Sequence, residues 1–171
     1  MCVSRPTRRG FLRGFLIAAA LGMAKPAAAG MRAGDRPRTV RLPDLAGAEV
    51  ALPDAYLGKV VAVHFWATWC PYCIKEIDAL EALFGQYRER GFTPVSVNVG
   101  ETKSVAEDFL RSRKVTYPIL LDTDSSTAKL YGVTGIPTTF VLDRGGVVAF
   151  KILGEVNREG LRRILSGTLG T

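Results

Sequence analysis

Residues 59–73 read KVVAVHFWATWCPYC, and this stretch decides the fold. Residues 59–66 are almost all apolar, β-branched or aromatic, which is typical of a strand buried on both faces of a sheet. From Pro71 to about residue 90, apolar residues recur at three- and four-residue steps and predict an amphipathic helix that Gly91 ends. The sequence therefore predicts a buried strand that leads directly into a helix, with two cysteines at the junction.

Cys70 and Cys73 stand where this strand ends and the helix begins. The Cys70 sulfur should lie beside backbone N–H groups that no helical carbonyl accepts, and these donors and the helix dipole favour a thiolate. In Cys-x-x-Cys motifs such a position lowers a cysteine pKa from ~8.5 to between about 3.5 and 7.5. Pro71 suits the first helical position because its missing N–H needs no partner there. Cys73 lies on the same helical face and deeper, so position assigns Cys70 as the nucleophile and Cys73 as the resolving cysteine.

The rest of the domain, which we expect over residues 39–171, alternates strand and helix patterns. A capping box of Ser104 and Glu107 is expected to start the second helix, with Val105 facing inward. The predicted elements are a hairpin of residues 40–45 and 48–52, strands at 92–99 and 119–122, helices at 104–113 and 125–131, a hairpin of 138–142 and 147–153, and a last helix capped by Asn157 and ending near 169. This order predicts an α/β fold with a mixed central sheet and helices on both faces.

The net charge of +7 on this 171-residue chain is unevenly distributed. Five of its 23 basic residues and no acidic residue fall in positions 1–29, which leaves 18 basic against 16 acidic side chains in the rest. Such a balance gives no strong field for polyanions, so no nucleic-acid partner is expected. Beyond position 29 the only cysteines are Cys70 and Cys73, which excludes a multi-disulfide scaffold and leaves an inert clip, half of a metal site or a redox centre.

Residues 1–29 predict an export signal, with a basic start, a short apolar run at 15–23 and small residues before position 30. The paired Arg8 and Arg9 resemble the twin-arginine type of signal, and a Sec-type signal is the alternative. An uncleaved anchor is a third option, although the run of nine apolar residues is far shorter than the ~20 that span a bilayer. Residues 30–38 are polar and predict a flexible tether.

Two segments resemble the signatures of the thioredoxin superfamily, namely FWATWCPYC at residues 65–73 and GIPTTF at residues 135–140. The export signal, the WATWC motif and the helical insertion near 104–113 are similar to the extracytoplasmic TlpA, ResA and DsbE-like cytochrome c maturation branch, and the likeness covers about residues 40–168. The resemblance implies a thioredoxin fold with an N-terminal β-hairpin and a helical insertion. It also implies a periplasmic thiol-disulfide oxidoreductase that reduces disulfides of exported proteins, for example in cytochrome c maturation.

The same resemblance implies how the site works. Pro137 is expected to be cis and to lie against the cysteine pair, and Ile136 is expected to offer backbone hydrogen bonds to the substrate chain. The Cys70 thiolate attacks a substrate disulfide, and Cys73 then displaces the substrate as a thiol. A membrane protein of the DsbD or CcdA kind is the expected electron donor, the protein is expected to be a monomer, and no bound cofactor is required. Because redox potential sets the direction, an oxidase or isomerase role stays open.

Further residues near the motif have two interpretations each. His64 is either a neutral imidazole hydrogen-bonded in the core or a proton acceptor for Cys73. Glu76 is either a solvated surface carboxylate or, as in the ResA-type proteins that this chain resembles, a group that tunes cysteine acidity. Trp69 and Tyr72 form a contact platform for a partner or pack the active-site turn. With Pro71, these two aromatic residues complete the predicted substrate-binding surface.

Three other functions are alternatives to disulfide reduction. A metal-delivery protein would use thiolates with a histidine, but His64 precedes the motif inside a core strand and is poorly placed to reach a metal at the cysteines, so no metal site is expected. A peroxidase would need its reactive cysteine three residues after a threonine, whereas Thr68 stands two before Cys70. A non-catalytic binding module would carry an inert or fully stable disulfide.

Overall fold

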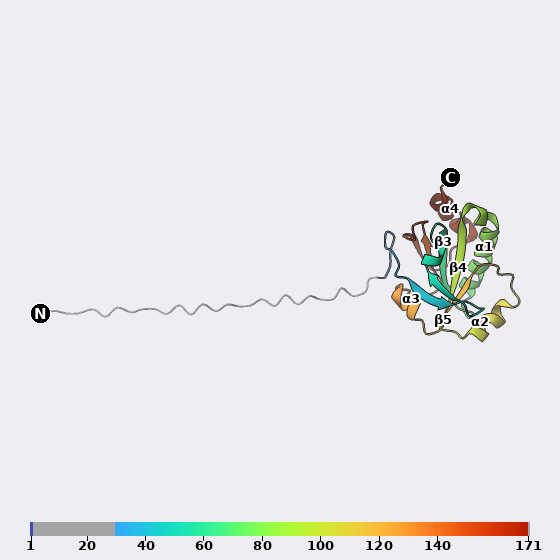
Figure 1. The fold of residues 1–171 in the computed structure, drawn as a ribbon, viewed down its shortest axis with the longest axis horizontal. Helices are drawn as coiled ribbons and strands as arrows, with labels where there is room; N and C mark the ends of the chain where they lie inside the picture. The colour runs from blue at the N-terminus through green and yellow to red at the C-terminus, as the bar shows by residue number, and fades with distance from the viewer. Residues whose placement is uncertain (2–29, 171) are drawn as a thin grey trace.

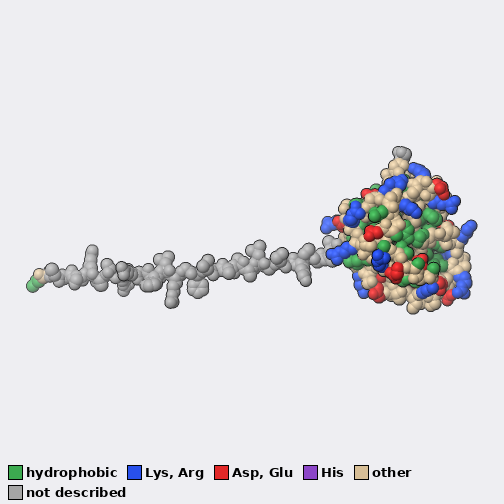
Figure 2. Space-filling view, viewed as in Figure 1, with side chains coloured by type: hydrophobic (Ala, Val, Ile, Leu, Met, Phe, Trp, Pro, Cys, Tyr) green, Lys and Arg blue, Asp and Glu red, His purple; other side chains and the backbone are tan. Residues whose placement is uncertain are grey.

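The computed structural model describes residue 1 and residues 30–170. The predicted export signal, including Arg8 and Arg9, therefore lies outside the described residues. The described helices include none that is both long and apolar enough to cross a membrane. Basic and acidic side chains are interspersed over the face of the domain that Figure 2 shows, in agreement with the near balance of charge outside positions 1–29.

A five-stranded mixed sheet forms the centre of the domain, in the strand order β5-β4-β3-β6-β7. Strand β3 occupies the middle position, and all seven of its residues are buried, as its composition predicts. It pairs in parallel with β4 and antiparallel with β6, which confirms the mixed sheet. The five strands are β3 (Val60–Trp66), β4 (Phe92–Val99), β5 (Ile119–Asp122), β6 (Thr138–Leu142) and β7 (Val148–Leu153).

Helices cover both faces of this sheet, as predicted (Figure 1). Alternate residues of β3 point to opposite faces, so Val60, Ala62 and Trp66 pack with α1 and α4. Val61, Val63 and Phe65 instead pack with α3 and the N-terminal hairpin. The helices are α1 (Pro71–Tyr87), α2 (Lys103–Leu110), α3 (Ser126–Leu130) and α4 (Arg158–Leu169), and a 3₁₀ turn (Arg88–Arg90) extends α1 to Gly91.

The predicted N-terminal hairpin consists of β1 (Val40–Pro43) and β2 (Glu49–Leu52), which pair antiparallel. A single antiparallel bridge between Asp44 and Leu120 attaches the hairpin to β5, the edge strand of the sheet. Residues 30–38, the predicted tether, also contact the domain: the Gly34 N–H donates to the Val148 carbonyl at 2.8 Å, and the Val148 N–H donates to the Asp35 carbonyl at 2.9 Å.

The start of α2 differs from the prediction. The helix begins at Lys103 with Thr102 as its N-cap, so Ser104 lies inside the first turn and the predicted capping box is wrong. The Ser104 hydroxyl instead meets the Thr102 hydroxyl at 3.0 Å. Val105 is 43% exposed rather than facing inward, because the residues that this register turns to the core are Ala106 and Leu110.

Candidate active site

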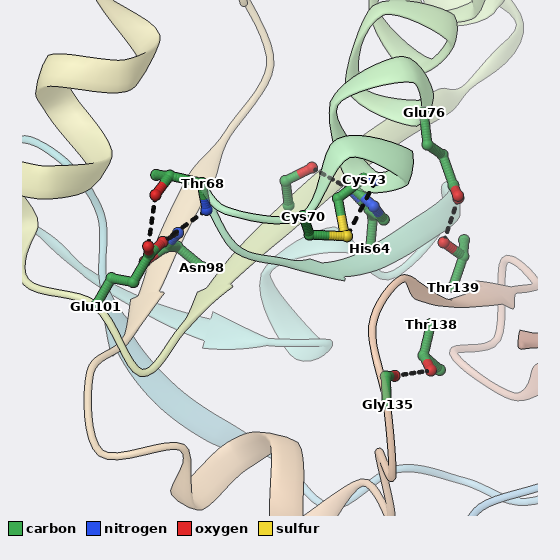
Figure 3. The surroundings of a disulfide bond; sticks show 11 residues. His64, Thr68, Cys70, Cys73, Glu76, Asn98, Glu101, Gly135, Thr138 and Thr139 are labelled. Carbon is green, nitrogen blue, oxygen red and sulfur yellow. Dashed lines mark hydrogen bonds between the residues drawn. A yellow bond between two sulfur atoms is a disulfide. The ribbon is translucent and has the colours of Figure 1, made fainter. Parts of the chain in front are cut away.

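The two cysteines lie at the junction of β3 and α1. Cys70 is the N-cap of α1 with an extended backbone, and Pro71 takes the first helical position. The Cys73 N–H donates to the Cys70 sulfur at 3.2 Å, so an otherwise unpaired amide of the first turn points at this sulfur (Figure 3). The two residues form a disulfide with their Cα atoms 5.3 Å apart. Both cysteines are buried, with Cys70 3% exposed and Cys73 fully buried.

A carboxylate that the sequence analysis did not single out holds the loop before Cys70. Glu101 accepts the Thr68 N–H at 2.9 Å, the Thr68 hydroxyl at 2.6 Å and the Asn98 amide at 2.7 Å (Figure 3). Because β3 and β4 are parallel neighbours, residues after their carboxyl ends meet at one edge of the sheet. No local motif marks Glu101; its place beside Thr68 could have been predicted only from the parallel pairing of these two strands.

Glu76 is buried beneath α1, so its interpretation as a solvated surface carboxylate is wrong. Its Oε1 accepts the hydroxyl hydrogen of Thr139 on β6. Burial raises the pKa of Glu76 to about 7, and the hydrogen bond from Thr139 only partly opposes this rise. A backbone hydrogen bond with Val156 also opposes the rise, and the nearby Glu155 adds to it. The structure thus places a carboxyl group that titrates near neutrality one helical turn from Cys73.

His64 is also fully buried, in the middle of a row of polar residues that crosses three strands. In the strand register His64 pairs with Ser96 of β4 and with Thr139 of β6. Its Nδ1 lies 3.2 Å from the Ser96 hydroxyl. Burial lowers the pKa of His64 to about 3, so the imidazole is neutral near pH 7, as its structural interpretation expects.

The predicted substrate-binding residues differ in their exposure to solvent. Trp69 is 70% exposed and Tyr72 is 55% exposed, so neither ring packs into the core, and Pro71 is exposed between the cysteines. The Ile136–Pro137 peptide bond is cis, as the resemblance implies, and Pro137 is buried.

A largely apolar pocket of about 310 Å³ opens beside Trp69 and Ile136. Residues of β4, α3 and the segment before Pro137 complete its wall: Val99, Ser125, Ala128, Lys129, Val133, Thr134 and Gly135. The pocket therefore joins two of the predicted substrate-binding residues, although they are far apart in sequence. The described residues contain no group of three His, Cys, Asp or Glu side chains suited to hold a metal ion.

Comparison with known proteins assigns the family. The model of the AhpC/TSA family matches residues 33–151. The chain belongs to the AhpC/TSA family. This member is 38% identical to thiol-disulfide oxidoreductase ResA of Geobacillus thermodenitrificans over 124 residues, which is 72% of this chain and 71% of the relative. It is 36% identical to the Bacillus subtilis ResA over 122 residues, which is 71% of this chain and 67% of the relative.

Solved structures agree with the fold of this AhpC/TSA family member. A Chlorobium tepidum protein described as thiol:disulfide interchange protein DsbE superposes with a TM-score of 0.78 at 31% identity, over 82% of this chain and all of the other. StoA from Bacillus subtilis superposes with a TM-score of 0.64 at 28% identity, over 75% of this chain and 96% of StoA. The protein is thus a thiol-disulfide oxidoreductase of thioredoxin fold rather than a non-catalytic binding module.

Proposed function

We propose that this enzyme reduces disulfides of exported proteins in the periplasm, with Cys70 as the nucleophile and Cys73 as the resolving cysteine. The observation that carries the proposal is the position of the Cys70 sulfur, which accepts a first-turn N–H of α1 at 3.2 Å. The preceding residue, Trp69, lines a largely apolar pocket. In the reduced enzyme this position stabilises a Cys70 thiolate. The thiolate attacks a substrate sulfur, and the second substrate sulfur leaves with the bonding electron pair. Cys73 then gives up its proton and attacks the Cys70 sulfur, which breaks the bond between Cys70 and the substrate and releases the first substrate sulfur as a thiol. The substrate has thus gained two electrons and two protons, and the cysteine pair is oxidised.

Glu76 is the group best suited to take the proton that Cys73 loses in the second step. Its pKa of about 7 lies near the working pH, which is the condition for efficient general-base catalysis. His64, whose pKa is about 3, is a much weaker base. We therefore assign the proton transfer to Glu76 and treat His64 as a neutral neighbour.

Substrate binding is proposed for the exposed residues next to Cys70, namely Trp69, Pro71 and Tyr72, together with Ile136 and Pro137. The pocket beside Trp69 and Ile136 has the size and the apolar lining to take a side chain of the substrate next to its cysteine. We assign Pro71, Tyr72 and Pro137 to the same binding surface, and propose that the backbone of Ile136 offers hydrogen bonds to an extended substrate chain.

The cellular setting of the proposal rests on the sequence and on the relatives. Residues 1–29 have the composition of an export signal, which directs the domain to the periplasm or keeps it anchored there. A reductant in that oxidising compartment needs electrons from a membrane donor, for which we propose a protein of the DsbD or CcdA kind. The cysteines of apocytochrome c are the proposed clients, by likeness to the ResA and DsbE proteins named above.

A trapping experiment tests this function. Cys73→Ser leaves Cys70 able to attack but removes the thiol that releases the substrate, so mixed disulfides should accumulate on Cys70 in the cell envelope. Non-reducing separation followed by mass spectrometry identifies the trapped proteins, and the double variant Cys70→Ser/Cys73→Ser is the matched control. We expect exported proteins with paired cysteines in the trap and not in the control; equal recovery from both would contradict the proposal.

A further inference from the structure

A chain of hydrogen bonds leads from His64 to the helix that carries Cys73. His64 Nδ1 lies 3.2 Å from the Ser96 hydroxyl, and the Ser96 hydroxyl lies 3.3 Å from the Tyr117 hydroxyl. The Tyr117 hydroxyl lies 3.5 Å from the backbone carbonyl of Ile77 in α1. All four residues are buried, so the chain is closed off from solvent at the histidine end.

The Ile77 carbonyl of α1 determines which group donates in each of these hydrogen bonds. The Ile77 carbonyl can only accept, so Tyr117 donates its hydroxyl hydrogen to it. The Tyr117 oxygen then accepts the hydroxyl hydrogen of Ser96, and the Ser96 oxygen is left to accept from His64. A neutral imidazole carries a single N–H, so this direction places the hydrogen on Nδ1 and leaves a lone pair on Nε2.

The surroundings of Nε2 favour the same tautomer independently. Nε2 of His64 is buried and has no hydrogen-bond partner among the described residues. For backbone groups, a buried N–H without an acceptor is rare, and an under-satisfied carbonyl is somewhat less so. The opposite tautomer would bury such an N–H at Nε2, so the unpartnered atom also points to the Nδ1–H form.

Reduction of the disulfide supplies a donor in the core cluster that contains the two β3 residues flanking His64 on the same face. His64 lies between Ala62 and Trp66 on the face of β3 that packs under α1, and both of these neighbours share a core cluster with Cys73. In the reduced enzyme Cys70 is the thiolate, so the donor that appears in this core is the S–H of Cys73.

We infer that Ser96 and Tyr117 are positioning residues that hold His64 as the Nδ1–H tautomer, and that Nε2 accepts a hydrogen bond from the Cys73 thiol in the reduced enzyme. This inference rests on the proposed function for the roles of the two cysteines. The bond keeps Cys73 protonated while Cys70 is ionised, and no covalent bond forms or breaks. Glu76 on α1 and Tyr117 share this core, and burial raises the pKa of each. Among the charged groups that face them, Glu155 also raises the pKa of Glu76, and Glu81, Asp78 and Glu76 also raise that of Tyr117.

Nitrogen NMR on the enzyme labelled with ¹⁵N-histidine tests the inference directly, because His64 is the only histidine of the chain. Long-range ¹⁵N–¹H correlations of the oxidised enzyme should show a protonated Nδ1 and an unprotonated Nε2. Reduction should shift the Nε2 signal in the direction of a hydrogen-bond acceptor and leave Nδ1 protonated. This measurement needs no substrate, so it stands or falls separately from the proposed function.

Variants separate the positioning role from general packing. Tyr117→Phe and Ser96→Ala remove one link each and should give a mixture of tautomers. Tyr131→Phe is the matched control, because Tyr131 is also buried and donates to a backbone carbonyl, that of Arg38 at 3.4 Å, on the other face of the sheet. The control should keep the wild-type spectrum. A protonated Nε2 in the wild-type enzyme, an Nε2 signal unchanged by reduction, or equal spectra for Tyr117→Phe and the control would each overturn the inference.

Discussion

Cys70→Ser is expected to lower the rate of disulfide reduction by at least about a thousand-fold, the scale on which enzymes lose activity when their nucleophile is removed. A serine hydroxyl is not ionised near pH 7 and cannot form the mixed disulfide, so neither of the two exchange steps can occur. The position of Cys70 at the N-cap of α1 is what makes it the first nucleophile, since its sulfur accepts the Cys73 N–H. Reduction of a disulfide-bonded peptide, followed by release of its thiols, measures this rate.

The Cys73→Ser variant shows which of the two cysteines attacks the substrate first. It should also abolish turnover, but one equivalent of substrate should remain attached to Cys70, because the first attack needs only the Cys70 thiolate. Mass spectrometry of the quenched reaction distinguishes the two variants. An adduct on Cys73 in the Cys70→Ser variant, at the rate of the wild-type first step, would reverse the assignment of the two cysteines.

Glu76→Gln is expected to slow the release of the substrate roughly 100-fold at pH 8, within the usual range for loss of a general base. In the wild-type enzyme this step should accelerate as pH rises through about 7, because only the ionised Glu76 accepts the Cys73 proton. His64, with a pKa of about 3, stays neutral over this range and adds no step to the profile. Single-turnover kinetics from pH 5 to 9 should show the step for the wild type and none for the variant.

The same carboxyl group makes stability depend on pH. The folded-state pKa of Glu76, about 7, lies above its ordinary value of 4.5, so the native protein keeps a proton that the unfolded chain loses. The corresponding stabilisation is complete below pH 4.5 and is lost as pH rises through 7, with a total of about 3 kcal/mol. Urea unfolding should show this decline in the wild type and not in Glu76→Gln. Glu89→Gln, at an exposed glutamate, is the control and should unfold as the wild type does.

The sequence predicts the parts of the fold that local patterns determine. The apolar run of β3, the periodicity of α1 and the N-cap of α4 at Asn157 all carry their signal within a few residues, and the structure confirms each of them. The start of α2 is an exception, because Thr102 and Ser104 are both acceptable caps and packing selects the register that buries Ala106.

The surroundings of the cysteines depend instead on contacts between distant segments. Glu76 meets Thr139 across 63 positions, and Thr68 meets Glu101 across 33. A charged residue on a helix is usually solvated, so no local feature of the sequence marks Glu76 as buried. Its burial follows from the placement of β6 next to β3, which brings Thr139 under α1.

The acidity of Cys70 in the reduced enzyme is the most direct test of the whole mechanism. The rate of its alkylation by iodoacetamide, followed from pH 3 to 10 with mass spectrometry to separate Cys70 from Cys73, reports the thiolate fraction. We predict an apparent pKa between about 3.5 and 7.5, because the sulfur lies at the positive end of α1 and accepts a first-turn N–H. A Cys70 that titrates near ~8.5, as a free cysteine does, and that stays inert toward protein disulfides near neutral pH would contradict the account.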